Sequence, residues 1–218
     1  METQTRSALV AGASGLIGGH LLDALLAEPL YREVHSLGRR ALSRQHPRLH
    51  QHTVDFARLG DTALPAAQDA FCCLGTTIKK AGSREAFRAV DHDAVLAFAR
   101  GAKQAGVQRF LVVTALGANP RSRVFYNRVK GEVEEALAAL GFQSLVILQP
   151  SLLLGERSES RPGERAAIVA SRVLAPLLRP LPGRPIEARK VARAMLALAR
   201  DTPWGVRVVP SKELQALG

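Results

Sequence analysis

The feature that most constrains this chain is a set of three glycines, each three residues after the last, near the N-terminus. The pattern lies between an apolar segment, residues 7–11, and a segment with apolar side chains at helical spacing, residues 16–28. In such a turn, one glycine permits the sharp reversal, one lets backbone N–H groups approach a diphosphate, and one lets the helix pack against the strand. The segment reads Gly12-Ala13-Ser14-Gly15-Leu16-Ile17-Gly18. It predicts a strand–turn–helix unit that binds a dinucleotide.

Apolar runs continue to alternate with helical patterns along the chain. The further strand candidates are 33–37, 49–56, 70–74, 110–113, 144–148 and 206–209, and the helix candidates are 84–105, 123–140, 165–178 and 188–200. Fully apolar strands separated by helices indicate a parallel sheet that is buried on both faces. We therefore predict an α/β fold with a doubly wound parallel sheet, whose ligands lie beyond the carboxyl ends of the strands.

The length of the chain suits one domain. No linker, repeat or low-complexity tract interrupts residues 1–218, so we expect a single dinucleotide-binding domain. Within it, residues 156–205 begin with a polar stretch and contain a proline-rich break. We expect this segment to form a small lid on the substrate side.

Composition limits the partners and the location. The chain carries a formal charge of +11, and residues 151–200 hold ten basic and four acidic residues. These arginines are scattered, and no aromatic residue accompanies them, so we expect no dedicated nucleic-acid partner. Residues 7–22 are too short and too rich in glycine to span a membrane. The two cysteines are adjacent and do not suggest a disulfide framework, which led us to expect a reducing cytoplasm.

The segment after the second predicted strand indicates which dinucleotide is bound. Sites for NAD commonly place a carboxylate there, which binds the ribose 2′-hydroxyl. This chain has Arg39 and Arg40 instead, and no acid. A guanidinium group can bind the 2′-phosphate of NADP through two parallel hydrogen bonds. We therefore favour NADP(H) over NAD(H), although ordinary solvent-facing arginines would give the same pattern.

Two further segments follow predicted strands and are expected to line the cofactor. Asp55 and Phe56 end the third strand and are expected to meet the adenine edge. Leu74, Gly75, Thr76 and Thr77 follow the fourth strand and are expected to line the middle of the dinucleotide.

A third set of residues indicates acid–base chemistry. Thr114 ends the fifth strand, and Tyr126 and Lys130 are one turn apart on one face of the next helix. A tyrosine has an ordinary pKa of about 10, which a nearby ammonium group lowers toward a useful range. Thr114 could bind a substrate carbonyl or hydroxyl group. The Tyr–Lys spacing alone is common by chance, and an exposed helix pair is the alternative.

Taken together, these motifs resemble the short-chain dehydrogenase/reductase superfamily, and in particular an atypical branch that includes the Tat-interacting-protein-type NADPH-binding proteins and their small bacterial relatives. The resemblance spans nearly the whole chain. It rests on residues 12–18, on Phe71-Cys72-Cys73-Leu74-Gly75-Thr76-Thr77, on Tyr126-Asn127-Arg128-Val129-Lys130-Gly131-Glu132-Val133-Glu134, and on Gln149-Pro150-Ser151-Leu152-Leu153-Leu154-Gly155.

The resemblance implies a Rossmann fold, NADP(H), and roles for three residues. Thr114 would stand where the family usually has serine, Tyr126 would be the acid and base, and Lys130 would also hold the nicotinamide ribose. Pro150 would lie beside the nicotinamide. Residues 156–218 are too few for the long substrate domain of sugar-nucleotide epimerases, so we do not expect such substrates.

Two functions remain open from the sequence. One is an oxidoreductase that acts on a small carbonyl or alcohol, and the other is a regulator that binds NADPH without catalysis. Family members are monomers or homodimers, and the sequence does not distinguish these. His46, His50 and His52 cluster around the third strand, but no acid or cysteine completes a ligand set, so we expect no metal site.

Overall fold

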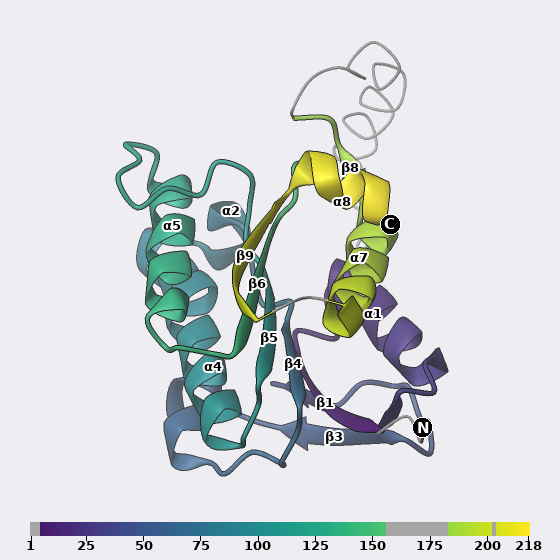
Figure 1. The fold of residues 1–218 in the computed structure, drawn as a ribbon. Helices are drawn as coiled ribbons and strands as arrows, with labels where there is room; N and C mark the ends of the chain where they lie inside the picture. Colours follow the sequence, from purple (N-terminus) through teal and green to yellow (C-terminus); the bar gives the residue numbers. More distant parts are fainter. Residues whose placement is uncertain (1–4, 156–182, 202–203) are drawn as a thin grey trace.

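The computed structural model of the protein describes residues 5–155, 183–201 and 204–218. Its centre is a seven-stranded sheet in which every neighbouring pair is parallel (Figure 1). The strand order is β3-β2-β1-β4-β5-β6-β9. The strands are β1 (Arg6–Ala11), β2 (Tyr31–Gly38), β3 (Leu49–Thr53), β4 (Asp69–Cys72), β5 (Arg109–Val113), β6 (Ser144–Gln149) and β9 (Gly205–Pro210). The predicted doubly wound parallel sheet is confirmed.

Helices cover both faces of the sheet. On one face lie α1 (Leu16–Ala27) and α7 (Ala188–Asp201), and on the other lie α4 (Ala94–Gln104) and α5 (Phe125–Ala138). Side chains alternate along each strand, so β1 sends Val10 to the first face and Leu9 to the second. Both faces are therefore apolar, which explains the continuous apolar runs in the sequence.

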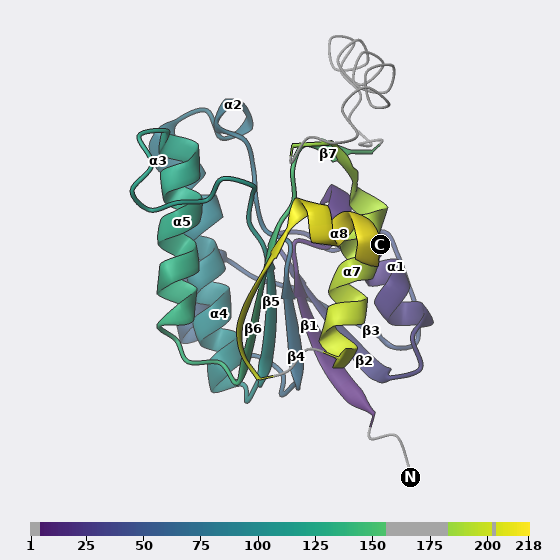
Figure 2. The same cartoon turned by 45° about the horizontal axis from the view of Figure 1, so that its top comes forward.

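Short elements complete the described chain. They are the 3₁₀ turn η1 (Phe56–Asp61), α2 (Ile78–Ala81), α3 (Arg84–Arg88), the π turn η2 (Ala89–Asp93), the two-strand pair β7 (Leu153–Leu154) and β8 (Ile186–Glu187), and α8 (Ser211–Leu217). The loops that lead to α2, α5 and β7 gather at one end of the sheet, where the central strands end (Figure 2). No helix among the described residues is long and apolar enough to cross a membrane.

Several elements differ from the prediction. The strand expected over 49–56 stops at Thr53, because Asp55 accepts a hydrogen bond from the amide of Ala57 and caps η1. The helix expected over 84–105 is interrupted by the π turn η2. The short elements α2, β7, β8 and α8 were not predicted.

The segment 156–205, expected to be a lid, is described only in part. Residues 156–182, which include the helix expected over 165–178, lie outside the described residues. Residues 188–201 form α7, which packs against α1 and buries Val191, Met195 and Leu198 in the core. This part of the segment contributes to the main fold.

Candidate dinucleotide-binding and catalytic site

The glycine-rich turn leaves room only for backbone. Gly12 has a φ of +87°, and a Cβ atom there would lie 2.5 Å from the carbonyl oxygen of Cys73. A Cβ atom on Gly18 would lie 2.1 Å from the carbonyl oxygen of Gly12, so α1 can approach the turn only at a glycine. Gly15 and Ser14 are exposed, and α1 begins at Leu16 without a side-chain cap or an acid in its first turn. Its first N–H groups are therefore available to an anion, while Ile17 is buried in the core.

A cavity of about 370 Å³ adjoins this turn and carries the two predicted arginines. Its lining consists of Ser14, Arg39, Arg40, Ala41, Leu42 and Ser43. The side chain of Gln51 on β3 holds the loop through hydrogen bonds with the Leu42 amide and the Arg44 carbonyl group. Arg39 and Arg40 are exposed, and neither forms an ion pair with any acid among the described residues. Two arginines without a carboxylate partner in the described part of the chain thus line the cavity, which fits an added phosphate.

The residues predicted to meet adenine take different positions. The Asp55 carboxylate is exposed but caps η1, and Phe56 is buried in the core on the α4 side of the sheet. Phe56 therefore packs in the core and stabilises the loop after β3.

The loop after β4 lies beside the predicted lysine. The ammonium group of Lys130 is buried and pairs with Oδ1 of Asp91, on η2, at 2.7 Å. The other oxygen of Asp91 accepts a hydrogen bond from the amide of Thr76 at 2.8 Å. A Cβ atom on Gly75 would lie 3.4 Å from Asp91 and 3.9 Å from Lys130, so this loop passes directly over the ion pair. Burial raises the pKa of Asp91, and the Lys130 charge and both hydrogen bonds oppose that rise.

Two residues of this loop have local roles. Thr77 accepts a hydrogen bond from the amide of Lys80 and caps α2. Leu74 is partly buried against the core on the α4 side. The loop formed by residues 74–77 leaves β4 at the carboxyl end of the sheet. Its position agrees with the expected lining of the cofactor, which stays a prediction.

The surroundings of Tyr126 disfavour its ionisation. Its ring is 5.4 Å from that of Phe87, and its hydroxyl group has no hydrogen-bond partner among the described residues. Burial raises the pKa of Tyr126, the Lys130 charge opposes the rise, and the Asp91 charge adds to it. The sequence predicts a lowered pKa for Tyr126, and this prediction is wrong. The reason is that desolvation of the half-buried phenol outweighs the charge of Lys130, and that the charge of Asp91 adds to the rise.

Thr114 is bound to a side chain that the prediction did not assign. Its hydroxyl group donates to Oε1 of Glu134 on α5 at 2.5 Å, and the carbonyl oxygen of Leu148 lies 3.3 Å away. The side-chain amide of Gln149 donates to both oxygens of Glu134, at 3.1 and 3.0 Å. Burial raises the pKa of Glu134, and the hydrogen bonds from Thr114 and Gln149 and the charge of Lys130 oppose the rise.

Pro150 continues from β6 beside this group. Its carbonyl oxygen accepts a hydrogen bond from the amide of Leu116 at 2.9 Å, so the loops after β5 and β6 are joined. The structure thus gathers the predicted residues 75, 76, 114, 130 and 150 at the carboxyl end of the central strands.

Asp91 and Glu134 were missed as site residues. Glu134 follows Lys130 by four residues, so helical spacing already places the two on one face. Asp91 had no comparable signal, because only the π turn η2 directs it toward Lys130.

The histidines group differently from the prediction. His35 on β2 stacks on His50 of β3, with ring centroids 5.0 Å apart, and its Nδ1 atom lies 3.1 Å from Nε2 of His52. His46 is not part of this cluster. Among the described residues, no three potential ligands are arranged to hold a metal ion.

Comparison with known proteins identifies the family. A family model described as NAD(P)H-binding matches residues 12–202. The chain belongs to this NAD(P)H-binding family. It is 41% identical over 169 residues to the protein HTATIP2 of Rattus norvegicus, covering 75% of this chain and 69% of that one. It is 34% identical over 216 residues to the mitochondrial protein FMP52 of Eremothecium gossypii, covering 97% and 96%. These relatives confirm the resemblance to the atypical short-chain dehydrogenase/reductase branch.

Solved structures support the fold of this family member. MoeE5 in complex with UDP-glucuronic acid and NAD has a TM-score of 0.71 at 20% identity, covering 93% of this chain and 75% of that one. A short-chain dehydrogenase from Burkholderia cenocepacia in complex with NADP has a TM-score of 0.69 at 17% identity, covering 99% and 92%. The family member thus shares the fold of these two proteins.

One expectation is overturned by the relatives. The cysteine content led us to expect a cytoplasmic protein, but relatives from Eremothecium gossypii and Emericella nidulans are named as mitochondrial proteins. Unpaired cysteines indicate a reducing compartment and do not distinguish one such compartment from another.

Proposed function

We propose that this NAD(P)H-binding protein is an NADP(H)-dependent oxidoreductase that acts on a small carbonyl or alcohol. The observation that carries the choice of NADP(H) is the cavity beside the glycine turn, where Arg39 and Arg40 are exposed and lack a carboxylate partner among the described residues. A carboxylate in the same place would repel the 2′-phosphate, and the described loop has none.

In this reaction the residues of the chain would have the following roles. The nicotinamide, when bound, supplies or accepts the hydride. Tyr126 donates a proton to the carbonyl oxygen in reduction and accepts it in oxidation. Its hydroxyl group has no partner among the described residues, which leaves it available to a substrate. Lys130 stabilises the tyrosinate after proton transfer, and Asp91 holds the ammonium group in place at 2.7 Å.

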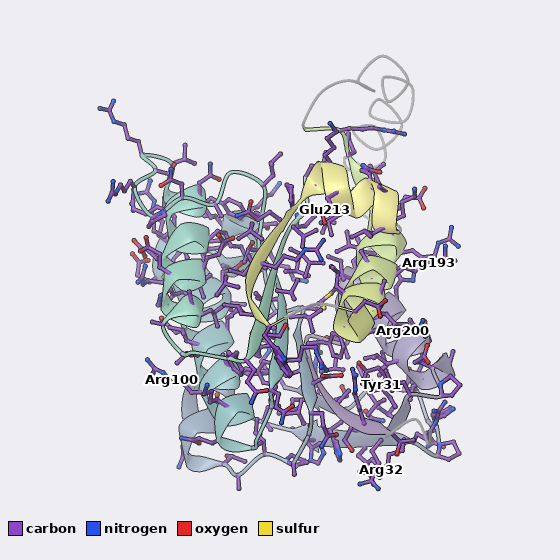
Figure 3. All side chains as sticks on the ribbon, in the orientation of Figure 1. Tyr31, Arg32, Arg100, Arg193, Arg200 and Glu213 are labelled. Carbon is purple, nitrogen blue, oxygen red and sulfur yellow. The ribbon has the colours of Figure 1, made fainter. Side chains whose placement is uncertain are left out.

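A parallel titration with NADPH and NADH tests the cofactor. We expect NADPH to bind more tightly, and Arg39→Gln and Arg40→Gln each to weaken NADPH by about 10–100-fold, since a hydrogen bond between charged groups is worth about 1.5–3 kcal/mol. Binding of NADH should change little. Arg32→Gln is the matched control, because Arg32 lies near the start of β2, the strand that leads to Arg39, at the far end of the sheet (Figure 3). Equal affinity of the wild type for both nucleotides would overturn the choice of NADP(H).

A regulator that binds NADPH without catalysis is the second candidate. It is favoured by the hydrogen bond from Thr114 to Glu134, which occupies the hydroxyl proton that a substrate carbonyl would need. Tyr126→Phe separates the two functions in a screen of aldehydes, ketones and quinones that follows NADPH consumption. An oxidoreductase loses turnover in this variant and retains its affinity for NADPH. A regulator shows no turnover in the wild type either.

A further inference from the structure

Glu134 occupies a place that the proposed chemistry does not use. It lies on the inner face of α5, where Tyr126, Lys130 and Glu134 follow one another at intervals of four residues. Alternation along β5 and β6 directs Thr114 and Gln149 to the same face of the sheet, next to Phe110, Val112, Leu145 and Ile147 in the core on the α5 side. Three elements thus bring a hydroxyl, an amide and a carboxyl group together at the face of α5 that carries Tyr126 and Lys130.

The hydrogen bonds around Glu134 suit its charged form. A threonine hydroxyl has one proton, and here that proton is directed at Oε1 of Glu134. The amide of Gln149 directs its protons at the same carboxyl group. In this arrangement Glu134 only accepts hydrogen bonds, and an ionised carboxylate can accept at both oxygens.

The two charge states of Glu134 have opposite consequences for the substrate. When Glu134 is ionised, it takes the Thr114 proton, so the Thr114 oxygen can only accept a hydrogen bond from an alcohol. When Glu134 is protonated, it donates to the Thr114 oxygen, and the Thr114 proton turns to another acceptor, which is the Leu148 carbonyl oxygen at 3.3 Å or, when substrate is bound, its carbonyl oxygen. We propose that Glu134 is a positioning residue whose charge decides whether Thr114 donates or accepts the hydrogen bond to the substrate oxygen. The functional part of this inference rests on the proposed oxidoreductase activity.

The surroundings of Glu134 contain opposing influences on its charge. On α5 itself Lys130 favours the ionised form, and on η2 Asp91 pairs with Lys130. The strands β5 and β6 contribute the neutral Thr114 and Gln149. On α4, Arg100 points outward (Figure 3), and Lys103 donates to the carbonyl group of Gly141 at the other end of α5. Burial favours the neutral form, so the group is placed to change charge as the pH changes.

The first test needs no substrate. Infrared spectra of the full chain, recorded with and without NADPH from about pH 4 to 9, follow the C=O stretch of the carboxylic acid. We expect one band that disappears in Glu134→Gln and remains in the matched control Glu135→Gln, whose side chain is exposed one position further along. Thr114→Val removes the donor to the ionised form, so the midpoint of this band should move up by about one pH unit.

An unchanged midpoint in Thr114→Val would overturn the inference, because Thr114 would then not donate to Glu134. A band that is still present in Glu134→Gln would do the same. Both results can be obtained whether or not the protein is an enzyme. This inference can therefore fail while the proposed function stands, and the proposed function can fail while the contact between Thr114 and Glu134 is confirmed.

The second test uses any carbonyl compound from the screen that is reduced. In the wild type, kcat/KM for reduction should fall as the pH rises through the infrared midpoint of Glu134, and kcat/KM for oxidation of the product alcohol should rise. An amide does not titrate, so Glu134→Gln should lose both changes and Glu135→Gln should keep them. A purely structural glutamate would lower stability in Glu134→Gln and leave the shape of the pH profile as in the wild type, which would refute a positioning role.

Discussion

Replacing Asp69 with asparagine should destabilise the protein strongly without affecting the cofactor site. Asp69 is fully buried at the start of β4, the opposite end of the sheet from the glycine turn. It pairs with Arg6 at 3.2 Å and with Arg109 at 2.5 Å, and it accepts a hydrogen bond from the Tyr31 hydroxyl at 2.8 Å. Burial raises the pKa of Tyr31, so its hydroxyl remains a donor. Asp69→Asn leaves two guanidinium groups without a counter-charge.

The magnitude follows from the burial of these partners. Breaking a buried ion pair from one side costs about 3–5 kcal/mol. The side chain of Arg6 is 23% exposed and can regain some hydration, so we expect a value near the lower limit, about 3 kcal/mol. For a chain of this length, that corresponds to a decrease in Tm of about 6–12 °C. Tyr31→Phe removes one hydrogen bond to a charged group and should cost about 1.5–3 kcal/mol.

Urea unfolding and calorimetry of both variants and the double variant measure these values. Because Tyr31 and Asp69 contact each other, the two effects should not add. Asp23→Asn is the control, since Asp23 pairs with Arg44 at the surface and should cost less than about 1 kcal/mol. NADPH affinity of the folded protein should be unchanged in all of them. A loss below about 1 kcal/mol in Asp69→Asn would refute the view that this buried network is required for stability.

Two further predictions concern the glycine turn and the histidine cluster. Gly18→Ala places a Cβ atom 2.1 Å from a backbone oxygen, so it should cost about 1–3 kcal/mol and weaken NADPH at least about 10-fold, whereas Gly19→Ala, with 3.7 Å of space, should be tolerated. Titration calorimetry and urea unfolding check both, and equal effects of the two substitutions would contradict the close packing. Burial and the neighbouring His50 lower the pKa of His52, so the unfolded chain takes up protons first and stability is lost as the pH falls below about 6.5. Unfolding free energies measured at about pH 5 and 7.5 should show a smaller loss of stability at low pH in His52→Gln than in the wild type. The exposed control His20→Gln should lose as much stability as the wild type. The same pH dependence in His52→Gln as in the wild type would show that the histidine cluster is not responsible.

Parts of the site could be predicted because they depend on local rules. The turn from Gly12 to Gly18 requires glycine because a side chain there would clash with the backbone, and the absence of an acid after β2 can be read directly from the sequence. The spacing of Tyr126 and Lys130 is a property of any helix. The π turn that presents Asp91 could not be predicted, because it replaces a helical turn only where packing against α5 favours it.

The sequence by itself determined the parallel sheet, the order of its strands and helices along the chain, and the edge at which ligands must bind, because periodicity and glycine spacing act over a few residues. Only the tertiary structure decided how the charges within that edge are balanced. Lys130 is neutralised by Asp91 from η2, Thr114 donates to Glu134 from α5, and burial raises the pKa of Tyr126 where the sequence suggested the reverse. The physical reason is that a pKa depends on every charge and on the desolvation around a group, and these neighbours come from segments that only folding brings together.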